Sequence, residues 1–178
     1  MRHTHASSAT PFALLAAVLL YVAAAAIVAP PAAIAQRGKA VVCGDPTVRC
    51  RTGEITFPPH NLPFQIPRRA IVWETEQFYA VVLKSMRVTE EYEECERFIS
   101  EEDRLEAQRL FPRNKVFTSR CTEPGDLYYT NTEPKQRFMA VFAGRTRAQA
   151  DAMLEKVKAT GKYPGANLRR MRTNFNGT

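Results

Sequence analysis

The chain has 178 residues and carries 25 Lys and Arg against 18 Asp and Glu, which gives a formal net charge of +7. This length allows one domain preceded by a leader, and the positive charge favours an anionic partner. His60 is the only histidine beyond residue 5, and no C-x-x-C spacing occurs. The composition therefore argues against a zinc site.

Residues 1–35 have the pattern of a secretory signal peptide. Arg2 precedes an almost wholly apolar run at residues 12–28, and Ala33-Ile34-Ala35 fits the small-x-small rule for cleavage. We expect removal of the leader after Ala35 and export to the periplasm or cell envelope. The alternative is an uncleaved membrane anchor, because the apolar run is close to the lower limit for a membrane span.

Four cysteines follow the leader, and an even number in an exported chain predicts disulfides. Three pairings are possible. We favour Cys43–Cys50, because it closes a short local loop, together with Cys95–Cys121. The second bond would tie an acidic insertion at residues 89–96 to the strand that follows the first helix.

Residues 36–77 are rich in proline and turn residues, including Pro58-Pro59 and Pro63. This composition indicates an irregular arm and not a domain. Its apolar residues, Phe57 and Phe64 among them, predict that the arm lies against the core of the domain that follows.

The first half of that domain reads as strand, helix and strand. Residues 78–83 form an apolar run typical of a buried strand. Ser100 and the three acidic residues after it suit the start of a helix, where the dipole favours negative charge. A second strand is expected at residues 115–119, and residues 126–129 are a candidate for a short extended piece in the loop that follows.

The second half repeats this order with stronger signals. Residues 138–143 predict a buried strand that ends at Gly144, and Thr146 with Gln149 predicts a capping box. Gly161 is suited to end the helix, and residues 167–172 lead out as a basic strand. The apolar stripe of the helix is predicted to consist of Ala150, Met153, Leu154 and Val157.

Two such halves in tandem predict an α+β domain at residues 78–173 with a tail at 174–178. The expected fold is ferredoxin-like βαββαβ, a four-stranded antiparallel sheet with both helices on one face.

Binding is more strongly indicated than catalysis. His60 lies in the arm, and the chain has neither a nucleophile-elbow motif nor a phosphate-binding loop. The glutamates of the acidic insertion are typical of a solvated loop, although paired carboxylates can hydrolyse glycosides. No cofactor is expected, and an enzyme acting on wall glycan is the weakest hypothesis.

The predicted central strands are apolar on both faces. Either the arm covers the face that lacks helices, or Phe138 and Phe142 form an aromatic platform for sugar rings. The last strand adds three arginines that suit an anionic ligand or, alternatively, a charged edge strand that resists aggregation. These are Arg169, Arg170 and Arg172.

Residues 138–144, the helix at 148–159 and the run at 163–170 resemble the SPOR domain, the sporulation-related repeat of bacterial envelope proteins. A weaker likeness covers residues 79–120. The resemblance implies a non-catalytic domain that binds peptidoglycan glycan strands through its exposed sheet face, with Ser85 as a possible polar contact. Peptidoglycan or another anionic envelope polymer is the expected partner, and export argues against nucleic acid. The alternative is an exported protein-interaction or structural envelope module that binds no glycan.

Overall fold

The computed structural model describes residues 39–53, 55–65, 74–89, 95–120 and 127–175. The chain divides into two units, Met1–Ile34 and Ala35–Thr178, and every described residue belongs to the second. The expected leader, Cys121 and most of the acidic insertion lie outside the described residues.

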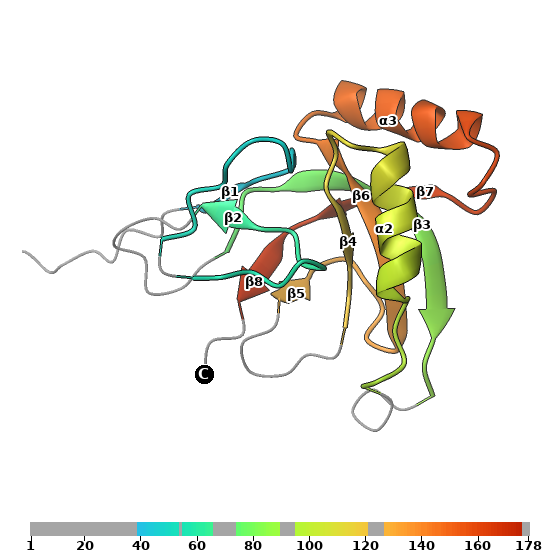
Figure 1. Ribbon diagram of the computed structural model, residues 1–178, viewed down its shortest axis with the longest axis horizontal. Coiled ribbons are helices and arrows are strands. Elements are labelled where there is room, and N and C mark those ends of the chain that lie inside the picture. The colour runs from blue at the N-terminus through green and yellow to red at the C-terminus, as the bar shows by residue number, and fades with distance from the viewer. Residues whose placement is uncertain (1–38, 54, 66–73, 90–94, 121–126, 176–178) are drawn as a thin grey trace, which may run out of the picture. The chain divides into compact units, whose positions relative to one another are not determined.

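The centre of the second unit is a four-stranded antiparallel sheet with the order β4-β6-β3-β7. Its strands are β3 (Phe78–Arg87), β4 (Val116–Thr118), β6 (Gln136–Gly144) and β7 (Asn167–Met171). Helix α2 (Glu101–Leu110) joins β3 to β4, and α3 (Arg147–Ala159) joins β6 to β7 (Figure 1). Each helix therefore links two strands that have one other strand between them. The prediction of an α+β fold with one such sheet and two helices is confirmed.

Both helices contribute to a single apolar cluster on one face of the sheet. The cluster contains Val81 from β3, Val141 from β6, Ala107 from α2 and Val157 from α3, all fully buried. The start of α3 is the expected capping box, in which Thr146 and Gln149 bond reciprocally. Local sequence signals and core packing thus agree on this face.

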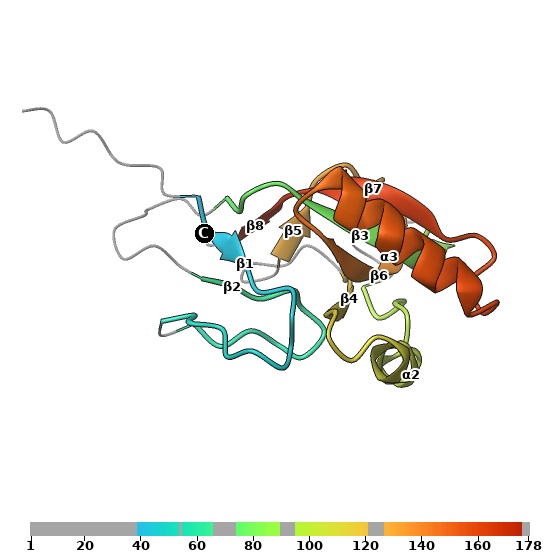
Figure 2. The same ribbon diagram turned by 90° about the horizontal axis from the view of Figure 1, so that it is seen from above.

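The opposite face is partly covered by two small strand pairs (Figure 2). In the arm, β1 (Val41–Val42) pairs with β2 (Phe64–Gln65), and later in the chain β5 (Leu127–Tyr129) pairs with β8 (Thr173–Phe175). The last strand extends beyond residue 173, where we expected the domain to end.

Side chains from these pairs form a second apolar cluster with Phe78, Phe117 and Phe142 of the sheet. The arm contributes Val42, which is nearly fully buried, and Phe64, which is fully buried. The prediction that the arm packs against the core is confirmed.

The arm contains a disulfide between Cys43 and Cys50, as predicted. Cys95 is also disulfide-bonded, and its expected partner Cys121 lies outside the described residues. The disulfides indicate an oxidising environment. Neither helix in the described part of the chain has the length and apolar character needed to cross a bilayer.

Candidate functional site

A bulge in β3 determines which face of the sheet Ser85 occupies. Val82 lies opposite Ala140, but Lys84 lies opposite Met139, so the register with β6 shifts by one residue between them. Because strand side chains alternate between faces, regular spacing would place Ser85 beneath the helices. The bulge instead places Ser85 opposite Phe138, on the face that lacks helices.

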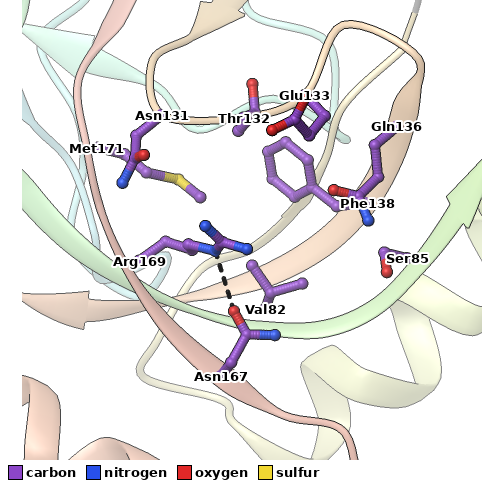
Figure 3. A pocket seen from close by; sticks show the side chains of 10 residues that line it. All are labelled: Val82, Ser85, Asn131, Thr132, Glu133, Gln136, Phe138, Asn167, Arg169 and Met171. Carbon is purple, nitrogen blue, oxygen red and sulfur yellow. Dashed lines mark hydrogen bonds between the residues drawn. The ribbon is translucent and has the colours of Figure 1, made fainter.

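Beyond this bulge, a cavity of about 120 Å³ opens between β3, β7 and the turn that precedes β6. We call it the sheet-face pocket (Figure 3). Its buried apolar floor consists of Val82, Phe138 and Met171. The rest of the lining is polar and consists of Ser85, Asn131, Thr132, Glu133, Gln136, Asn167 and Arg169.

Arg169 is the cation of the pocket. It pairs in register with Ala80, so its side chain lies on the helix-free face, and its Nε donates to Oδ1 of Asn167 at 3.1 Å. No ion pair holds it within the part of the chain that the structure describes. The guanidinium is therefore available to a carboxylate or phosphate.

The other two predicted arginines do not line the sheet-face pocket. Arg170 pairs in register with Tyr79, on the helix side, and hydrogen-bonds Gln77. Arg172 forms an ion pair with Glu74 at 2.9 Å. Arg170 is excluded from the pocket because neighbouring residues of a strand point to opposite faces of the sheet. Arg172 is already paired with a carboxylate.

The two predicted aromatic contacts are buried, with Phe138 only 3% exposed and Phe142 8% exposed. Phe138 packs edge-on against Phe117 and Tyr129. The expectation of an open aromatic platform is wrong, because the arm and β5 cover these rings. Phe138 still forms part of the floor of the sheet-face pocket, whereas Phe142 lies outside this pocket.

Sequence reasoning missed the residues that the turn before β6 contributes. Asn131 has a positive φ of 60°, a conformation that asparagine tolerates better than most residues, and its Nδ2 donates to the carbonyl oxygen of Arg170 at 3.2 Å. This bond holds the turn against β7 and places Glu133 at the pocket. An asparagine in a polar loop was the only available signal, and it does not specify a binding site.

Among the described residues, no group of three His, Cys, Asp or Glu side chains is placed to hold a metal ion. The sheet-face pocket has one carboxylate, Glu133, and one guanidinium, Arg169. Such an arrangement can bind hydroxyl, amide and carboxylate groups. Comparisons with protein-family models, curated proteins and solved structures gave no match.

Proposed function

We propose that this protein is an exported, non-catalytic envelope protein that binds peptidoglycan glycan strands through the sheet-face pocket. The observation that carries the proposal is the meeting of Ser85, Phe138 and Arg169, which come from three different strands and line one cavity. Phe138 and Arg169 were singled out as ligand contacts from the sequence, and Ser85 was implied as a contact by the resemblance to SPOR domains.

The chemistry of the cavity suits a substituted sugar. The apolar floor accepts the non-polar face or methyl group of a saccharide, and the amides of Asn131, Gln136 and Asn167 can bond to hydroxyl and acetamido groups. Arg169 suits a carboxylate carried on the sugar. A cavity of about 120 Å³ has room for one substituent of a sugar, so the rest of the glycan strand would run across the protein surface.

The fold supports the same assignment. The order β4-β6-β3-β7, with a helical crossover in each half, is the arrangement of a ferredoxin-like βαββαβ sheet. We propose this classification, which is also the architecture implied by the resemblance to SPOR domains. With the predicted signal peptide, the disulfides favour a location in the periplasm or envelope.

A second candidate is an exported protein-interaction or structural module. Its specific support is the burial of Phe142 and its neighbours beneath the arm, which leaves only part of the helix-free face accessible. In this case the pocket would be a gap at the edge of the covered region.

Titration of ¹⁵N-labelled protein with purified glycan strands that lack stem peptides distinguishes the two candidates. Glycan binding predicts saturable shifts for the amides of Ser85, Asn167 and Arg169. An absence of shifts, or shifts confined to residues outside the sheet-face pocket, would reject the glycan proposal and favour the interaction module.

A further inference from the structure

A second cavity, of about 280 Å³, lies between the arm and the edge of the domain, on residues that the proposed function does not use. We call it the arm pocket. The part of its lining that matters here consists of Val41, Val48, Arg49, Arg113, Phe142 and Arg145.

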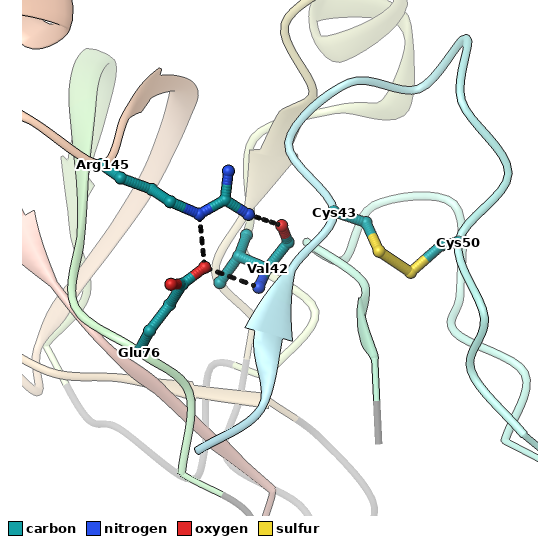
Figure 4. Close-up of a disulfide and its surroundings, with 5 residues drawn as sticks. All are labelled: Val42, Cys43, Cys50, Glu76 and Arg145. Atoms are coloured by element: carbon teal, nitrogen blue, oxygen red, sulfur yellow. Dashed lines mark hydrogen bonds and ion pairs between the residues drawn. A yellow bond between two sulfur atoms is a disulfide. The ribbon is translucent and has the colours of Figure 1, made fainter. Parts of the chain in front are cut away.

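The walls of the arm pocket are held together by specific bonds (Figure 4). Arg145 donates from Nη2 to the carbonyl oxygen of Val42 at 2.6 Å and from Nε to Glu76 at 2.5 Å. The Cys43–Cys50 disulfide closes the loop that carries Val48 and Arg49. The cavity is therefore preorganised, which lowers the entropic cost of binding.

The arm pocket carries unbalanced positive charge. Arg49 and Arg113 are exposed and form no ion pair within the described residues. The one lining carboxylate, Asp45, accepts hydrogen bonds from the hydroxyl and backbone N–H of Thr47, and these bonds lower its pKa. The charge of Arg113 also acts on Asp45, so this carboxylate offsets at most one of the two guanidinium charges, and the remaining positive charge favours an external anion.

Apolar surface lies beside these charges. Val41 is 39% exposed and Val48 is 64% exposed, and they are two of four large apolar residues exposed in the described part of the chain. Their gathering at one cavity indicates a ligand that presents a small apolar group next to its negative charge.

We propose that the arm pocket binds the carboxyl terminus of a short peptide that ends in small aliphatic residues. The terminal carboxylate pairs with Arg49 and Arg113, and the side-chain methyl groups contact Val41 and Val48. The volume of about 280 Å³ is just below the range for ligand sites, about 300–1,000 Å³, and fits one or two residues. Such a terminus occurs on wall peptides with D-residues and on proteins with L-residues.

The test uses N-acetyl-alanyl-alanine in its L,L and D,D forms, with the L,L amide as the uncharged analogue. NMR titration should shift the amides of Val41, Val48 and Arg113 with the acids, and the amide analogue should bind at least about tenfold more weakly. Preference for the D,D acid would identify a wall peptide as the source, and preference for the L,L acid would identify a protein terminus.

The variants are Arg49→Gln with Arg113→Gln, and Arg51→Gln as the matched control. The double variant should lose about tenfold in affinity for the acids, whereas Arg51→Gln removes one positive charge outside the arm pocket and should bind as wild type. Equal binding of acid and amide, no binding of either acid, or an unaffected double variant would overturn the proposal. Glycan binding at the sheet-face pocket should be unchanged in the double variant. Failure of the peptide proposal can therefore be distinguished from failure of the glycan proposal.

Discussion

Gly44 lies against the ring of Phe142 so closely that a Cβ on Gly44 would fall 2.1 Å from Cδ1 of the ring. The backbone of the arm is fixed there, because the N–H of Lys115 donates to the carbonyl oxygen of Gly44 at 2.7 Å. Phe142 is itself almost fully buried. Only glycine allows the arm to approach β6 at this distance.

Replacement of Gly44 by alanine should therefore destabilise the protein by about 1–3 kcal/mol through overpacking. Gly165→Ala is the matched control, since nothing lies within 4 Å of a Cβ at that position. Urea denaturation of both variants measures the difference. Equal stability of Gly44→Ala and wild type would show that the arm is not seated on Phe142.

The packing of α3 against the sheet predicts that substitutions at two adjacent residues of this helix differ strongly in their effect on stability. Val157 is fully buried among residues of the sheet, whereas Lys158 forms an exposed ion pair with Glu155 at 3.0 Å. Val157→Asp should cost more than about 3 kcal/mol, because it places an unpaired carboxylate in the core, and Lys158→Asp should cost less than about 1 kcal/mol. Thermal unfolding of the two variants at the same temperature would contradict the packing of α3.

A disulfide between Cys95 and Cys121 remains a prediction. Cys95 is disulfide-bonded, and closing a loop of about 26 residues should stabilise the fold by about 3.5 kcal/mol in the chain-entropy model. Peptide mapping under non-reducing conditions should recover the two cysteines in one linked peptide. Recovery of Cys121 as a free thiol would refute the pairing.

Lys115 predicts a pH dependence of stability. Burial, with a further effect of the nearby Arg104 charge, lowers the pKa of Lys115 to about 8, while its Nζ donates to the carbonyl oxygen of Pro59 at 2.7 Å. An unfolded lysine has a pKa of about 10.4, so between these values the unfolded chain binds more protons than the folded one. The contribution of Lys115 to the free energy of unfolding therefore rises with pH through this window.

The measurement compares wild type with Lys115→Met by urea denaturation at pH 7 and pH 10. Relative to the variant, wild type should gain about 1–2 kcal/mol at the higher pH. The comparison removes the titration of groups that both proteins share. A difference that does not change with pH would mean that Lys115 keeps its ordinary pKa in the fold.

The elements with local signals were predictable from the sequence. Thr146, Gln149 and Val157 specify α3 through capping and apolar spacing, which act within the helix itself. The Cys43–Cys50 pairing followed from the short loop between the two cysteines.

The site was harder to predict, because its geometry depends on pairings between distant segments. The bulge that places Ser85 on the helix-free face arises from the register of β3 with β6, and no residue of β3 marks it. Arg169 and Arg170 look equivalent in the sequence, but their separation follows from the pairing of β7 with β3. The β5–β8 pair joins segments more than 40 residues apart and likewise has no local signature.

The central claim is that the sheet-face pocket binds glycan strands. Its most direct test is sedimentation of the Arg169→Gln and Arg170→Gln variants with purified wall sacculi, before and after the stem peptides are removed. Both variants lose one charge from the same strand, but only Arg169 lies in the sheet-face pocket. We predict that Arg169→Gln loses most of its binding at low salt with little change in melting temperature, while Arg170→Gln binds as wild type and Ser85→Ala is only weakly affected. Equal binding of Arg169→Gln and wild type, or equal loss in both arginine variants, would contradict the assignment of glycan binding to this pocket.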